Sequence, residues 1–260
     1  MVLINLYFIS FYSLLSLCGM PYTIYLQQPS RSYTMAKYNL IGVGTNAKTI
    51  KGDGSEYITG ILYLIPELKL CPLSIIAGCH EPCLVSAGRG AFNSVQQSRQ
   101  RKTQLLLSNP EEFKRLLRED LTKFATYCKR KGVQPVIRLN GTSDKSWLDI
   151  IREFPEIQFY DYTKVYNRVA KDLPENYHLT LSYSEANPEY ADKVKAYADK
   201  YKANLAVVFR DKNNIPETFL GRPVINGDAD DLRFLDPSGV VVALYAKGKA
   251  KKDASGFVIG

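Results

Sequence analysis

Three cysteines lie close together in the sequence, and their spacing is the feature of this chain best suited to chemistry. Seven residues separate Cys71 from Cys79, and three separate Cys79 from Cys83. Thiolates are the ligands that zinc and iron–sulfur clusters prefer. Prolines and Gly78 between the cysteines suit an irregular loop that wraps around an ion. We therefore predict that Cys71, Cys79 and Cys83 hold a metal centre.

Two kinds of metal centre suit this cysteine loop (residues 71–83). Three thiolates without an obvious fourth ligand favour a 4Fe-4S cluster whose remaining iron is open to a small-molecule ligand. A structural zinc ion requires four ligands, and His80, Cys128 or His178 would have to complete the set. His80 directly follows Cys79, and neighbouring residues rarely point toward one ion. We expect the cluster and keep zinc as the alternative, beside a third reading in which the cysteines are small buried apolar side chains.

Composition describes the rest of the protein around this loop. With 260 residues and 45% hydrophobic residues, the chain is globular and long enough for one sizeable core. The chain has five cysteines, an odd number, and three of them are clustered in one loop, which favours a cytoplasmic protein over a secreted disulfide framework. Eleven basic residues stand against four acidic ones between Arg89 and Lys131. The helical part of this stretch, from Arg99 to Lys131, is either a nucleic-acid contact or a solvated helix face.

The first 34 residues differ from the rest of the chain. They are mostly apolar, and their first basic residue is Arg31, so the basic start of a signal peptide is missing. Asn5 and several serines interrupt the apolar run, which argues against a stable membrane span. Met35 would open an ordinary cytoplasmic protein. We expect residues 1–34, with Cys18, to be an appendage upstream of the true start, and residues 35–260 to form one domain.

After Met35, strand-like and helix-like segments alternate. Strands are predicted at residues 57–65, 135–139, 157–160, 178–182, 204–209, 223–225 and 239–245. Helices are predicted at residues 94–107, 164–171 and 188–202, and a further helix should begin after Asn109 and end at Gly132. This alternation is typical of a parallel α/β fold. We expect a partial or irregular β/α barrel of mainly parallel strands, with an open doubly wound sheet as the alternative.

Polar residues stand at the ends of several predicted strands, where parallel α/β folds carry their sites. Arg138, Asn140 and Asp144 lie at the end of strand 135–139. Glu185 follows strand 178–182, and Arg210 follows strand 204–209. We expect these five residues to bind the cofactor or a small-molecule ligand.

Three stretches of the chain resemble the phage family called gene product 88. They are Leu70-Cys-Pro-Leu-Ser with the residues up to Lys102, then Arg138-Leu-Asn-Gly-Thr-Ser-Asp, and finally Ala246-Lys-Gly-Lys-Ala with Gly256-Phe-Val. The likeness extends roughly from Asn39 to Ile259. It implies a phage-encoded protein in the host cytoplasm, and it implies no particular activity.

A second resemblance is to radical S-adenosylmethionine (SAM) enzymes, which place three cysteines after the first strand of a partial β/α barrel and bind SAM at the open iron. The spacing here is seven then three residues, where those enzymes have three then two. Pro82 stands where they usually have an aromatic residue, and Asn140-Gly-Thr replaces their Gly-Gly-Glu. The resemblance implies a radical-SAM-like iron–sulfur enzyme. The alternative is a zinc- or cluster-stapled nucleic-acid-binding module without catalytic activity.

Overall fold

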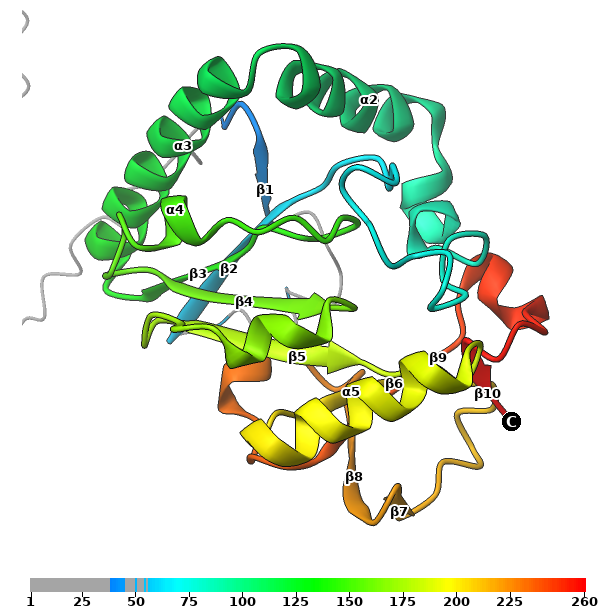
Figure 1. Cartoon of the computed structure of the whole chain (residues 1–260). Helices are drawn as coiled ribbons and strands as arrows, with labels where there is room; N and C mark the ends of the chain where they lie inside the picture. The colour runs from blue at the N-terminus through cyan, green and yellow to red at the C-terminus, as the bar shows by residue number, and fades with distance from the viewer. Residues whose placement is uncertain (1–37, 45–49, 51–53, 55) are drawn as a thin grey trace, which may run out of the picture. The chain divides into compact units, whose positions relative to one another are not determined.

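The strands of this protein pair into one mostly parallel sheet (Figure 1). The computed structural model describes residues 38–44, 50, 54 and 56–260. The parallel strands, in spatial order, are β2 (Tyr57–Leu62), β3 (Gln134–Arg138), β4 (Gln158–Thr163), β5 (Tyr177–Ser182), β6 (Leu205–Phe209), β9 (Val241–Tyr245) and β8 (Arg222–Asn226). Short antiparallel strands, β1 (Ile41–Val43) and β7 (Thr218–Phe219), flank them, and β10 (Val258–Ile259) pairs with β6. In the described part of the chain the fold is therefore mixed α/β, with a ten-stranded sheet that does not close.

The seven strands predicted from the sequence are all present, although their ends differ. Strand β2 ends at Leu62 and not at residue 65. The backbone N–H of Ile65 instead donates to the Thr103 hydroxyl at 2.9 Å, so the chain has already left the sheet there. The prediction missed β1, β7 and β10, because strands of two or three residues are too short for an alternating pattern.

The main predicted helices are confirmed as α2 (Asn93–Ser108), α3 (Pro110–Lys131) and α5 (Pro188–Tyr201). Helix α3 begins where Asn109 accepts a hydrogen bond from the N–H of Glu112 at 3.2 Å, and it ends at Gly132, whose φ is 70°. The predicted helix at 164–171 is instead the short 3₁₀ turn η3 (Tyr166–Ala170). The N–H of Lys164 donates to Asp144 at 2.7 Å, which ties the start of this segment to another loop. A single turn, α4 (Leu148–Ile151), precedes β4.

Helices α3 and α5 pack on the same face of the sheet. The core under α3 includes Ile137 and Phe159, and the core under α5 includes Leu181 and Leu205. Ile137 pairs with Phe159, Phe159 pairs with Tyr177 four residues before Leu181, and Leu181 pairs with Leu205. Because side chains alternate between faces along a strand, these residues share one face. The helices therefore leave the opposite face to other elements.

The opposite face is covered near the amino ends of its strands by the segment around η4 (Arg233–Leu235). Leu232 and Phe234 pack there against Val136 and Tyr160. Toward the carboxyl ends of the strands this face is hollow. The segment around η4 thus forms the floor of an opening at the carboxyl ends of the strands.

The C-terminal segment (residues 246–260) separates the carboxyl ends of β5 and β6. Strand β5 pairs with β6 only at Leu205 and Ala206, whereas farther along, Val208 and Phe209 pair with β10. The preceding 3₁₀ turn η5 (Gly248–Lys252), red in Figure 1, lies beside η1 (Leu84–Ser86), close to η2 (Gly88–Ala91). The end of the chain therefore meets the segment that follows the cysteine loop.

Residues 1–34, including Cys18, lie outside the described residues, so the predicted appendage stays a prediction. Within the described part, no helix combines the length and apolar character needed to cross a membrane.

Candidate functional site

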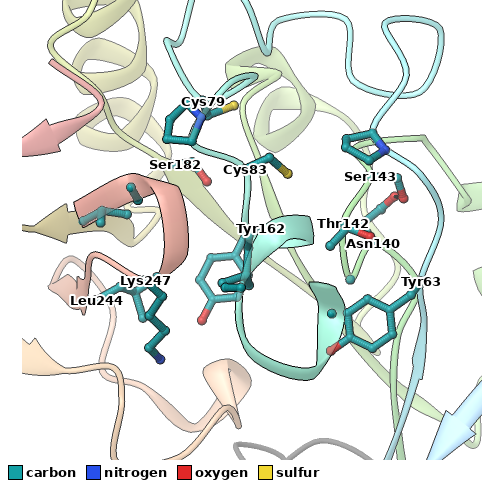
Figure 2. Close-up of a pocket in the computed structure, with 18 of the residues that line it drawn as sticks. Tyr63, Cys79, Cys83, Asn140, Thr142, Ser143, Tyr162, Ser182, Leu244 and Lys247 are labelled. Atoms are coloured by element: carbon teal, nitrogen blue, oxygen red, sulfur yellow. Dashed lines mark hydrogen bonds between the residues drawn. The ribbon is translucent and has the colours of Figure 1, made fainter. Parts of the chain in front are cut away.

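A cavity of about 820 Å³ opens at the carboxyl ends of the parallel strands. Figure 2 shows Cys79 and Cys83 on one side of this cavity and Tyr63, Asn140 and Thr142 on the other. The carboxyl edge of the strands is where parallel α/β folds bind their ligands. The size suits a small molecule, because ligand cavities commonly measure about 300–1,000 Å³.

The cysteine loop is folded around the backbone carbonyl of Ser74. This oxygen accepts hydrogen bonds from the backbone N–H of Cys79 at 3.0 Å and of His80 at 3.1 Å. Gly78, directly before Cys79, turns the chain with a φ of +66°. A Cβ there would lie only 2.6 Å from the Cβ of Ala186. A glycine is therefore required where the cysteine loop meets the loop after β5.

All three cysteines of the loop line the cavity. Cys71 and Cys79 are each 8% exposed, and Cys83 is partly buried. The Cys71 thiol faces the carbonyl of Thr142 at 4.0 Å, and the Cys79 thiol faces the carbonyl of Ser74 at 3.6 Å. The fold thus brings the three predicted metal ligands to one cavity, with Cys71 beside the loop after β3.

Burial raises the pKa of the Cys71 thiol to about 12, against the opposing charge of Lys164. Charges on Cys83 and Cys79 raise it further, so the three thiols lie close enough to influence one another. Burial also raises the pKa of Cys79. At neutral pH the Cys71 and Cys79 thiols carry their protons, and a metal centre would have to displace them.

Lys164 directly follows β4 and lines the cavity together with the three cysteines. Burial alone would lower the pKa of Lys164, but the charges of Cys79, Asp144 and Cys71 outweigh burial and raise it. Its ammonium group lies 3.4 Å from the hydroxyl of Ser182. A fixed positive charge therefore stands among the cysteines, where it favours a net-negative group.

A single zinc ion requires closely grouped ligands. Sulfurs around one zinc ion lie about 3.8 Å apart, as follows from Zn–S bonds of about 2.3 Å. Among the described residues, no three His, Cys, Asp or Glu side chains are grouped closely enough to hold one metal ion. The thiolates of a four-iron cluster bind separate iron atoms and stand farther apart. Both kinds of metal centre therefore stay predictions for the cysteine loop.

Arg138 lies on the floor of the cavity, where Asp231 pairs with it. Its guanidinium is 3.1 Å from the Asp231 carboxylate and 4.6 Å from the centre of the Tyr162 ring. Burial would lower the pKa of Arg138, but the Asp231 charge outweighs it and the pKa is raised. Arg138 therefore lines the cavity with its charge already paired, and its binding of a ligand stays a prediction.

Asn140 and Asp144 also line the cavity, but their side chains hold the loop after β3 in shape. The Asn140 amide accepts from the Ser143 hydroxyl and the Lys145 N–H, each at 2.9 Å, and donates to Asp161. Asp144 accepts from Lys164 and is paired with Arg168, as well as with the Thr163 hydroxyl. Both side chains therefore shape the wall and retain little capacity for a ligand.

Glu185 and Arg210 lie at the same end of the sheet but do not line the cavity. Glu185 is exposed, and its backbone N–H donates to the carbonyl of Gly256 at 2.9 Å. The Arg210 guanidinium donates to the carbonyl of Asp253 at 2.8 Å and to other carbonyls of the C-terminal segment. Strand β10 of that segment pairs with β6, so Glu185 and Arg210 contact the C-terminal segment.

The alternative zinc ligands are spread over the molecule. Cys128 is fully buried in the core under α3, on the helix-covered side of the sheet. His178 is not among the cavity residues, and burial lowers its pKa. His80 lines the cavity, and its Nδ1 lies 3.3 Å from the Ser74 hydroxyl.

Sequence reasoning did not select six charged residues of the cavity: Arg89, Arg99, Lys164, Asp228, Asp231 and Lys247. Lys164 could have been found from the sequence, because residues two apart along a strand share a face and Lys164 continues the series of Tyr160 and Tyr162. Asp231 and Arg99 belong to a turn and a helix that approach from elsewhere in the chain, so no strand pattern points to them.

Comparison with curated proteins and with solved structures yielded no match. Residues 38–260 match the family model described as gene product 88. This range contains the cysteine loop, the loop after β3 and the C-terminal segment, which are the stretches on which the resemblance in the sequence rests. The chain belongs to the gene product 88 family.

Proposed function

We propose that this protein binds a 4Fe-4S cluster through Cys71, Cys79 and Cys83 and uses it in a radical-SAM-like reaction. The observation that carries the proposal is the shared cavity, which the three thiols line together with the cationic Lys164. Thiolates and sulfides make such a cluster net negative, and a fixed ammonium offsets that charge. When bound, a cluster with an open iron supplies an electron and a coordination position for a ligand.

The order of the strands supports a partial barrel for this chemistry. From β2 to β6 the strands follow one another in the sheet as they do in the sequence, and α3 and α5 cover the same face. A doubly wound sheet reverses its strand order and carries helices on both faces. The cysteine loop follows the first parallel strand, as in the resemblance to radical SAM enzymes. The proposal therefore keeps SAM as the candidate co-ligand.

The residues of the cavity provide the surroundings of the reaction. Arg138 is held by Asp231 and stacked on Tyr162, so its position does not depend on a ligand. Asn140 and Asp144 keep the loop after β3 in place. A wall that is already ordered binds a ligand without further loss of conformational entropy. We place the protein in the cytoplasm of a phage-infected cell, where thiols stay reduced.

Anaerobic reconstitution with iron and sulfide tests the cluster. We expect about four irons per chain and a brown colour, both lost when Cys71, Cys79 and Cys83 are changed to Ala. Cys128→Ala is the matched control and should retain the iron, since Cys128 lies in the core under α3. Iron retained by the triple variant, or one zinc and no iron in protein purified without air, would contradict the proposal.

The alternative is a zinc- or cluster-stapled module that binds nucleic acid through the basic helices. Several cations of α3 are already paired with acids, which weakens this reading: Lys114 with Asp149, Arg115 with Glu112, and Arg118 with Glu153. Retention on DNA and RNA at graded salt separates the two functions. Strong retention that falls steeply with salt would favour the module.

A further inference from the structure

Arg99 on α2 is a buried cation in the cavity wall. Only 7% of it is exposed, yet it forms no ion pair with any carboxylate of the described residues. Its Nη1 donates to the carbonyl of Val85 at 3.3 Å, and its Nε has no hydrogen-bond partner in the described part of the chain. A buried guanidinium without a counter-charge is costly, so its retention requires an explanation.

The surroundings of Arg99 hold the guanidinium in one position. Its Cζ lies 4.7 Å from the centre of the Tyr63 ring. On its other side is Gly90, where a Cβ would lie 3.2 Å from Nη2. The Tyr63 ring is itself packed against Gly141, where a Cβ would lie 2.6 Å from the ring. Two glycines thus leave the space in which the guanidinium and the ring stack.

Arg99 differs from the other cavity cations that are at least partly buried, whereas Arg89 at the rim is exposed. Arg138 is paired with Asp231 at 3.1 Å, and Lys247 is paired with Asp228 at 2.5 Å. Lys164 stands beside the thiols, whose charge it can offset once a cluster is bound. Arg99 lies within electrostatic range of Cys83 but has no carboxylate partner among the described residues. Its charge faces the cavity, and guanidinium groups remain charged even when buried.

A structural role in holding the segment after Cys83 does not explain why residue 99 is a charged arginine. Arg99 does bind the carbonyl of Val85, but Gln96 donates to the same oxygen at 2.9 Å. A neutral amide therefore already performs this structural task one turn earlier on the helix. A planar group with several donors is instead suited to a carboxylate or a phosphate.

We infer that Arg99, stacked on Tyr63, is the subsite that binds the anionic group, a carboxylate or a phosphate, of a small molecule in the cavity. The inference rests on the proposed function for the role of that molecule. The subsite lies in the same cavity as the cysteines, so the cluster and the anionic end of the ligand would occupy different parts of one space. The ligand would supply the negative charge that Arg99 lacks.

Calorimetric titration of the full chain with pyrophosphate and with malonate tests the subsite and distinguishes its two ligand classes. The chain is used free of iron, so the result does not depend on whether a cluster forms. Arg99→Gln should weaken binding of the preferred anion roughly ten- to a hundredfold, as expected for a charged hydrogen-bonded pair. Arg101→Gln removes the same charge from an exposed position of α2 and should leave binding unchanged.

A second variant keeps Arg99 and its structural contacts. Val95 lines the cavity one turn before Arg99 on α2, so Val95→Glu places a carboxylate at helical pairing distance from the guanidinium. We expect this variant to lose anion binding while its melting temperature stays at or above that of the unaltered chain. No binding by the unaltered chain, equal losses in Arg99→Gln and Arg101→Gln, or full binding by Val95→Glu would overturn the inference.

Discussion

Arg138 and Asp231 are 93 residues apart in the sequence, yet the Arg138 Nη1 lies 3.1 Å from an oxygen of the Asp231 carboxylate. The same carboxylate accepts from the Tyr160 hydroxyl at 2.7 Å and from the Tyr162 hydroxyl at 3.3 Å. These contacts attach the segment around η4 to the face of the sheet that lies opposite α3 and α5. The floor of the cavity therefore depends on a polar network and not only on apolar packing.

Asp231→Asn should destabilise the protein strongly. The substitution leaves the buried Arg138 without its counter-charge, and breaking such a pair costs about 3–5 kcal/mol of unfolding free energy. Asp149→Asn breaks the more exposed pair with Lys114 and should cost less than about 1 kcal/mol. Urea unfolding of both variants measures the difference. Equal losses would mean that Asp231 does not hold the floor.

Gly78→Ala should loosen the cysteine loop. An alanine there would strain a φ of +66° and place its Cβ 2.6 Å from Ala186. Gly132→Ala is the matched control, because its φ is +70° with no atom within 4 Å of the added Cβ. The control should lose about 1 kcal/mol of stability and keep its iron. Gly78→Ala should lose more stability and bind less iron after reconstitution; normal iron binding would count against this role of Gly78.

Lys164→Met should make the proposed cluster harder to reduce. Loss of a cation beside the cysteines favours the less negative, oxidised form, so the reduction potential should fall by tens of millivolts, where about 59 mV is a tenfold change. Lys164→Arg should largely preserve the potential, and the exposed Lys171→Met should not change it. Spectroscopic redox titration measures this effect without any activity assay. An unchanged reduction potential in Lys164→Met would contradict an electrostatic effect of Lys164 on the cluster.

Asp161 should make stability fall as the pH rises. Burial raises the pKa of this carboxyl to about 7, although Asn140 and Tyr177 donate to it. The unfolded chain releases the proton near pH 4. The contribution of Asp161 is thus fully present below about pH 4 and is lost as the pH rises through about 7.

The unfolding free energy of the unaltered chain should therefore decline between about pH 4 and pH 7. Asp161→Asn cannot titrate and should show a flatter profile, whereas Asp149→Asn should keep the decline. Urea unfolding at a series of pH values measures the slopes. The same slope in Asp161→Asn and the unaltered chain would sink the prediction.

The amino-acid sequence by itself determined the local elements and the principal candidate ligands. Asn109 and Gly132 define the ends of α3 through their own capping geometry, which depends on a few neighbouring residues. The cysteine loop was placed correctly after the first parallel strand for the same reason, since strand and loop are adjacent in the chain. The gene product 88 resemblance also rests on contiguous stretches, and the family model confirms it.

The tertiary structure alone decided which side chains face the cavity. Alternation along β4 groups Lys164 with Tyr160 and Tyr162, but the packing of α3 and α5 on the other face decides that this group faces the cavity. Glu185 and Arg210 stand at the expected strand ends, but β10 pairs beside β6 and draws both toward the C-terminal segment. Arg99 reaches the cavity because α2 packs near the end of β2. Such placements result from contacts between distant segments, which leave no periodic signal in the sequence of either partner.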